Sequence, residues 1–195
     1  MNQPPVTRPS TFVTHGPDDT TPAGWRHALW LMILVAASVA FSLGFACAVP
    51  FAAFGATVAL TLERREAIWL TVALWLANQV IGFTVLGYPW TAETFVWGAV
   101  LGLVAVLATL SAQTAASRLR ELDRAIVVTA AFAAAFVVYE GALFAVSAGL
   151  LGGTENYAPQ IVARILEINA AGFVGLLLVN RLAAMVGLTA KPAFG

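Results

Sequence analysis

The sequence has few charged residues, and this shortage excludes most classes of soluble protein. Only 10% of its 195 residues are Asp, Glu, Lys or Arg, whereas 60% are hydrophobic. A soluble domain carries about 25% charged and about 45–50% apolar residues, because a surface that faces water needs charge. The sequence therefore predicts an integral membrane protein. Acidic and basic residues balance at a formal net charge of zero, which argues against a nucleic-acid partner.

Cysteine and histidine are equally scarce. Cys47 is the only cysteine, which excludes an intrachain disulfide and a cysteine-based metal cluster. His15 and His27 lie in or beside the polar N-terminal region, and no apolar segment contains a histidine. We therefore expect no metal and no cofactor in the membrane domain. The nucleophile–base pairs of membrane enzymes are missing too, so we expect a protein that is not an enzyme.

The start of the chain lacks the apolar stretch that a cleavable signal peptide needs. Residues 1–24 are polar and rich in proline and threonine, and they predict a disordered cytoplasmic tail. A second cytoplasmic tail is expected over residues 189–195. The domain between them, residues 25–188, is predicted to be embedded in the membrane.

Long apolar segments fill this domain. A membrane-spanning helix needs about 20 mostly apolar residues. The first run, residues 28–62, is too long for one such helix. Pro50 divides it, because a helix usually ends before the residue that precedes a proline. The pattern predicts an all-α bundle of six transmembrane helices, the second one short, over residues 27–48, 50–62, 67–86, 94–115, 125–150 and 159–186.

The basic residues predict the orientation of this bundle. With six crossings and a cytoplasmic N-terminus, every lysine and arginine except Arg164 falls on the cytoplasmic side, as the positive-inside rule requires. A single crossing by residues 28–62 would instead place Arg26 and the Arg64–Arg65 pair on opposite sides. The charges therefore favour six helices with both termini in the cytoplasm.

A few polar residues are predicted to lie in the outer half of the membrane. An ionisable group near the centre of a spanning helix costs at least ~2.5–3.5 kcal/mol, so each one needs a reason. Together with aromatic residues of the outer loops they predict a pocket open to the outside, whose candidate substrate-binding residues are Asn78, Gln79, Trp90, Glu140, Tyr157, Arg164 and Glu167. Asn169 lies on the same helix as Arg164 and Glu167.

Each of these residues also has a structural interpretation. Arg164 would pair with Glu167 or Glu140 and lock two helices together. Asn78 or Gln79 would join helices by hydrogen bonds, and because adjacent helical residues point about 100° apart, only one of the two is expected to face a pocket. Trp90 and the other outer aromatic residues would form an interfacial belt.

The first helix carries a run of small residues. Ala36 and Ala40 form a small-xxx-small step that lets another helix approach closely, either within this chain or from a partner.

With this step, the short second helix and the outer polar residues, the chain resembles the substrate-binding S components of energy-coupling factor (ECF) vitamin transporters. The resemblance covers about residues 26–188 and concerns architecture. It implies a multi-pass protein of a bacterial inner membrane that binds a vitamin-like small molecule on its outer side. It also implies a transmembrane coupling protein, docked on Ala36 and Ala40, and ATPase subunits as partners. The sequence has no phosphate-binding G-x-x-x-x-G-K-[ST] loop of its own.

Two other functions stay open. The chain would be a self-contained small transporter or channel if it completed a pathway by itself or as a dimer, although no internal repeat of the kind common in transporters is visible. It would be a non-catalytic scaffold or assembly protein if the polar residues were structural.

Overall fold

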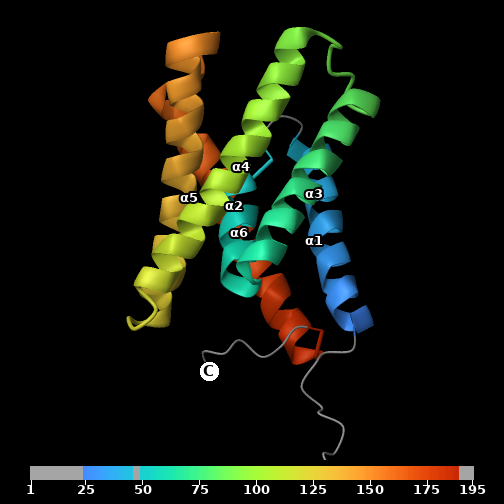
Figure 1. Ribbon diagram of the computed structural model, residues 1–195, viewed down its shortest axis with the longest axis vertical. Coiled ribbons are helices and arrows are strands. Elements are labelled where there is room, and N and C mark those ends of the chain that lie inside the picture. The colour runs from blue at the N-terminus through green and yellow to red at the C-terminus, as the bar shows by residue number, and fades with distance from the viewer. Residues whose placement is uncertain (1–23, 46–48, 189–195) are drawn as a thin grey trace, which may run out of the picture.

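The computed structural model describes residues 24–45 and 49–188, which fold into an all-α bundle without strands (Figure 1). The predicted fold class is confirmed. The helices are α1 (Gly24–Phe45), α2 (Phe51–Thr61), α3 (Arg64–Thr84), α4 (Ala92–Arg118), α5 (Arg124–Val146) and α6 (Pro159–Met185), with a π-helical turn η1 (Ser147–Leu151) and a 3-10 turn η2 (Thr154–Tyr157) between α5 and α6.

Five of these helices, all except α2, are long and apolar enough to cross a membrane. α2 has 11 residues and follows Pro50, as the sequence predicts. At a rise of about 1.5 Å per residue it extends about 16 Å, which is half of a hydrocarbon core of about 30 Å. The protein is therefore a multi-pass membrane protein in which one helix covers only part of the bilayer.

α2 lies at the centre of the bundle and packs against α3, α4, α5 and α6. Its first eight residues, Phe51 to Val58, are all buried. The surrounding contacts are made by small side chains that are fully buried: Ala52, Ala53 and Ala56 of α2, Ala105, Ala108 and Ala112 of α4, and Ala131 and Ala135 of α5. Small residues let helix backbones approach closely, and this is how membrane helices gain packing energy where lipid is as apolar as the core.

Hydroxyl groups join the helices inside this apolar core. The Thr71 and Thr109 hydroxyls of α3 and α4 are hydrogen-bonded at 3.0 Å. The Ser111 hydroxyl of α4 donates to the Ala134 carbonyl of α5 at 3.1 Å. Thr109 also lies against Gly55 of α2, where an added Cβ would come within 2.9 Å of its hydroxyl oxygen. Since lipid offers no hydrogen bonds, such contacts hold the helices in one arrangement.

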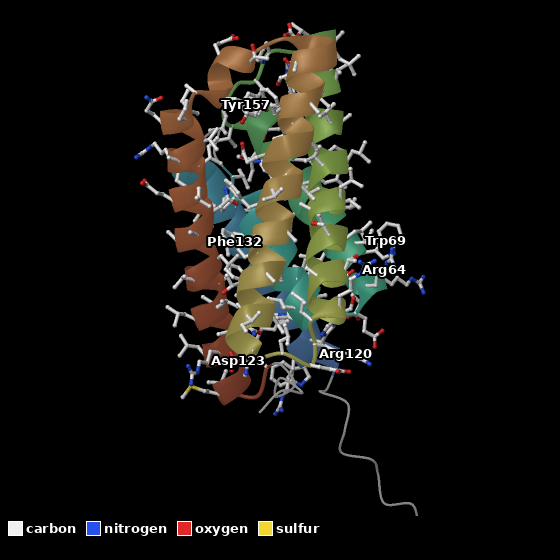
Figure 2. All side chains as sticks on the ribbon, turned by 90° about the vertical axis from the view of Figure 1, so that its left-hand side faces the viewer. Arg64, Trp69, Arg120, Asp123, Phe132 and Tyr157 are labelled. Atoms are coloured by element: carbon white, nitrogen blue, oxygen red, sulfur yellow. The ribbon has the colours of Figure 1, made fainter. Side chains whose placement is uncertain are left out.

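The first and last helices meet at one end of the bundle. The Arg26 guanidinium near the start of α1 donates to the Gly187 carbonyl just after α6 at 3.5 Å. His27 lies 3.4 Å from Glu66 at the start of α3. The turn between α4 and α5 lies at the same end (Figure 1), and Figure 2 shows Arg120 and Asp123 there, with Tyr157 near the other end. We call these the basic end and the far end, and the positive-inside rule assigns the basic end to the cytoplasm.

Candidate functional site

A group of polar side chains lies towards the far end of α5. Glu140 is buried, with 9% of its surface exposed, and among the described residues its carboxylate has no ion pair and no hydrogen bond. Glu140 lies about 24 Å along the helix axis from the first residue of α5, which starts at the basic end. Glu140 is therefore in the half of the bundle nearer the far end. A carboxylate held away from water without a partner is costly, so Glu140 is a candidate for a functional residue.

Tyr139, next to Glu140, is buried and faces the start of α2. Its ring centroid lies 6.3 Å from that of Phe51, the first residue of α2. The positive end of the α2 dipole consequently lies inside the bundle beside this part of α5.

Tyr157 of η2 completes the group from the loop before α6 (Figure 2). The Ser147 hydroxyl donates to the Tyr157 oxygen at 3.5 Å, and the Tyr157 ring packs edge-on against Phe144 at 5.2 Å. Burial raises the pKa of the Tyr157 phenol, and the negative charge of Glu140 raises it further, whereas the Ser147 hydrogen bond lowers it. Tyr157 therefore keeps its proton, and its O–H donates to no acceptor within the part of the chain that the structure describes. We call Tyr139, Glu140, Ser147 and Tyr157 the far-end cluster.

The backbone beside this cluster is irregular. α5 continues into the π-helical turn η1 from Ser147 to Leu151, and Gly152 and Gly153 follow with φ of 74° and 90°. Positive φ at two successive positions is cheap only for glycine, so this sharp reversal depends on both. Ser147 at the start of this turn is buried, because it follows the buried Leu143 by four residues and so lies on the inward face of α5. π-helical turns are frequent at functional sites.

Asn169 of α6 lies at about the same depth and joins α6 to α2 by a hydrogen bond. Its side-chain oxygen accepts a hydrogen bond from the Ala53 N–H at 3.2 Å, and its amide donates to the Ile165 carbonyl at 3.0 Å. Pro50, the residue at the α2 N-cap, makes no side-chain cap. Asn169 therefore caps α2 from another helix, which satisfies a backbone donor that would otherwise be unpaired in the membrane.

Arg164 and Glu167 do not join the far-end cluster, which corrects the expected convergence with Glu140. Both are exposed on α6, and neither forms an ion pair among the described residues. The inward face of α6 is occupied by Asn169, Gly172, Phe173, Leu176 and Ala183. With about 3.6 residues per turn, Glu167 points about 160° away from Asn169, so the two cannot share a cavity.

The adjacent amides Asn78 and Gln79 take different environments, as their spacing predicts. Asn78 is buried in α3, whereas Gln79 lines a groove of about 410 Å³ between α3 and α4. Trp90 lies in the same groove, 74% exposed, with its ring 5.1 Å from Phe83 and 5.9 Å from Phe95. This aromatic groove does not contain Glu140, Arg164 or Glu167. The seven predicted substrate-binding residues thus do not share one pocket.

Ala36 and Ala40 are exposed on the outer face of α1. Ala36 also lines a second groove, of about 890 Å³, between α1 and α3 near the basic end. Trp69 is two-thirds exposed in this groove, and Glu63, Arg65 and Glu66 lie at its edge. Ala36 and Ala40 are therefore not buried by the described part of the chain, whereas Ser38 of the same helix is fully buried.

Sequence reasoning missed two features of this region. Ser147 was not among the candidates, because a serine in an apolar helix carries little signal by itself. Asn169 was noted for its depth, yet its hydrogen bond to α2 depends on tertiary packing. The buried Tyr139–Glu140 pair was the visible signal. Comparisons with protein families, with curated proteins and with solved structures find no match for this chain.

Proposed function

We propose that this protein is the substrate-binding membrane subunit of an uptake transporter for a vitamin or related small molecule. It would bind its substrate from the far end, which faces away from the cytoplasm of a bacterial cell. The six-helix membrane bundle with a short, buried α2 supports this proposal, as does the chain's resemblance to ECF S components.

The observation that carries the proposal is that Glu140 is largely buried and unpaired. Glu140 is 9% exposed in the far half of the bundle, and its carboxylate has no partner among the described residues. Removing a carboxylate from water is expensive unless another group pairs with it. A substrate that brings a cationic or hydrogen-bond-donating group would supply that partner.

The neighbours of Glu140 define the rest of the substrate chemistry. Tyr157 offers aromatic surface, and among the described residues its O–H donates to no acceptor, since Ser147 donates to its oxygen. The α2 N-terminus beside Tyr139 favours a negative group on the substrate. We therefore infer a small molecule with a flat or ring-shaped body, at least one donor group, and an acceptor or anionic group.

The partners in this proposal are a transmembrane coupling protein and ATPase subunits, which would hydrolyse ATP for the complex. The exposed Ala36 and Ala40 support this assignment, because small residues on a lipid-facing helix let a second helix come close. The groove between α1 and α3 extends this surface towards the basic end, where cytoplasmic subunits would sit.

Substrate binding is tested on protein extracted in mild detergent. Native mass spectrometry would detect a retained small molecule, and calorimetry against a panel of vitamins would measure its affinity. Glu140→Gln should weaken binding at least tenfold while the protein stays folded. Glu155→Gln, which changes an exposed acid in the loop at the same end, should bind like the wild type. Absence of any bound molecule and of any binding across the panel contradicts the proposal.

Partner docking is tested by co-purification from the native host. Ala36→Leu and Ala40→Leu should abolish recovery of a coupling protein and ATPase subunits. Ala133→Leu, at an exposed position of α5, is the matched control and should leave recovery unchanged. Uptake by the purified chain alone in liposomes, without ATP, would instead identify a self-contained transporter.

A further inference from the structure

The groove between α1 and α3 joins an apolar wall to a charged edge. Both helices contribute to the wall, which includes Met32, Val35, Trp69, Leu70 and Ala73. Met32 and Trp69 are each two-thirds exposed, so the wall opens outwards. Three charged residues lie at one end of the groove, and we call them the charged rim: Glu63, Arg65 and Glu66. A groove with this lining suits a molecule that is apolar along most of its length and charged at one end.

The charged rim lies beside the membrane. Figure 2 shows Arg64 and Trp69 on the side of the bundle, farther from the basic end than Arg120 and Asp123. Tryptophan is enriched where membrane meets water, and Trp69 lies about 6 Å along α3 from Arg65. The rim therefore faces the headgroup region of the lipid, and the apolar wall faces the acyl chains.

The rim leaves one charge of each sign without a partner. Glu66 lies 3.4 Å from His27, whereas Arg65 and Glu63 form no ion pair among the described residues. The Glu63 side chain also makes no cap hydrogen bond at the start of α3. Residues two positions apart on a helix do not face each other, and like charges three apart repel. The rim therefore favours an added anion at Arg65 and an added cation at Glu63.

We propose that this groove binds a zwitterionic phospholipid with a primary amine, of the phosphatidylethanolamine class. The lipid phosphate would pair with Arg65, because a guanidinium binds phosphate through two parallel hydrogen bonds. The lipid ammonium would donate to Glu63. One acyl chain would lie along the apolar wall, which follows α3 for about 12 Å from Arg65 to Ala73.

The charges of the rim distinguish this headgroup from two other common ones. Phosphatidylglycerol has a phosphate but no cation, so it would leave Glu63 unpaired beside Glu66. Phosphatidylcholine has a cation without an N–H, so it could not donate a hydrogen bond to Glu63. This site does not depend on the proposed substrate, and a coupling protein on Ala36 and Ala40 would pack against the bound lipid.

Lipid competition tests the headgroup assignment. The full-length protein in mild detergent is mixed with equal amounts of the three phospholipids, all with the same acyl chains, and native mass spectrometry counts the lipids retained. The wild type should retain phosphatidylethanolamine at least about fivefold over either other lipid. Arg65→Gln should lower its retention about fivefold, since one cation near the membrane surface contributes about 1 kcal/mol. Glu63→Gln should remove the preference over phosphatidylglycerol.

Arg120→Gln and Glu121→Gln are the matched controls, because both residues are exposed at the basic end and lie outside the groove. Both should retain phosphatidylethanolamine as the wild type does. Equal retention of the three lipids by the wild type, an unchanged preference in both rim variants, or an equal loss in the controls overturns the proposal. A protein that co-purifies with the wild type but with neither rim variant identifies a protein occupant and overturns it too.

Filling the apolar wall gives a second measurement that does not depend on charge. Ala73→Phe places a ring where the acyl chain would lie, and it should lower the retention of phosphatidylethanolamine. Ala133→Phe adds the same ring at an exposed position of α5 and should leave retention unchanged. Equal retention by these two variants would show that the lipid is not held in this groove.

Discussion

The side-chain oxygen of Asn169 accepts a hydrogen bond from the backbone N–H of Ala53, 3.2 Å away and 116 residues earlier in the chain. This contact ties the last helix to the centre of the bundle. It also resolves a problem that a half-length helix creates, because α2 begins inside the membrane where water cannot satisfy its first N–H groups.

Asn169→Ala should lower the stability of the bundle. The Ala53 N–H would be left unpaired in a buried site, and loss of such a bond costs about 1–3 kcal/mol. Thermal unfolding in detergent, followed by fluorescence-detected size exclusion, measures the change. Asn180→Ala on the same helix is the control, because Asn180 is only partly buried and makes no hydrogen bond to α2 among the described residues. Equal melting temperatures for the two variants would contradict the capping role.

Gly55→Ala should destabilise the contact between α2 and α4. The new Cβ would lie 2.9 Å from the Thr109 hydroxyl oxygen and 3.3 Å from its backbone nitrogen. Forcing a methyl group into a packed core costs about 1–3 kcal/mol. Adding Thr109→Ala should recover part of the loss, since it removes the nearest atom. Gly141→Ala has open space around it and should be neutral, so a drop of equal size there would refute the clash.

Trp75→Phe should weaken the packing of α3 on α4 through one lost hydrogen bond. The Trp75 indole N–H donates to the Gly98 carbonyl at 2.7 Å. Its loss should cost about 0.5–1.5 kcal/mol. Trp69→Phe removes an exposed indole and should leave the melting temperature unchanged. If the exposed tryptophan mattered more than Trp75, the hydrogen bond would have no part in stability.

Glu140→Gln should leave the empty protein as stable as the wild type, or more stable. The glutamine side chain has nearly the same shape but removes the negative charge of a largely buried residue whose carboxylate has no partner among the described residues. A carboxylate retained for stability would behave in the opposite way. Thermal unfolding of ligand-free protein therefore separates a functional Glu140 from a structural one, and a marked loss of stability would favour the structural interpretation.

Two engineered cysteines test the orientation in a Cys47→Ser background. Thr154→Cys at the far end should react with a membrane-impermeant maleimide in intact spheroplasts. Glu121→Cys at the basic end should react only after the membrane is opened. Both positions are exposed, so access to reagent depends on the side of the membrane alone. The reverse pattern would invert the assigned orientation, and labelling of both from outside would contradict the number of crossings.

The helices could be predicted from the sequence because hydrophobic length and proline are local signals. The predicted second helix, residues 50–62, corresponds to α2 at Phe51–Thr61, and the other boundaries moved by only a few residues. α3 begins at Arg64 rather than 67 because a charged first turn continues a helix as well as an apolar one does. Asp123 marks the start of α5, since its side chain caps the Ala125 N–H at 2.8 Å.

The inward faces of the helices could not be predicted in the same way. In a membrane both lipid and core are apolar, so an apolar helix carries little record of which side packs inwards. The inward faces therefore had to be predicted from the polar residues, and a polar residue can point either inwards or outwards. Glu140 and Asn78 point inwards, whereas Arg164 and Glu167 point outwards at a similar depth. Only the packing of α6 on α2 decides between these cases.

The cap that Asn169 of α6 provides for α2 also has a consequence for biogenesis. A ribosome adds about 5–20 residues per second, so Asn169 would be made about 6–23 s after Ala53. Throughout that interval α2 is too short to hold its own place across the bilayer, and the donor at its start has no acceptor. The centre of the molecule is consequently the last part to be completed, and any quality-control step that inspects it must wait for the final helix.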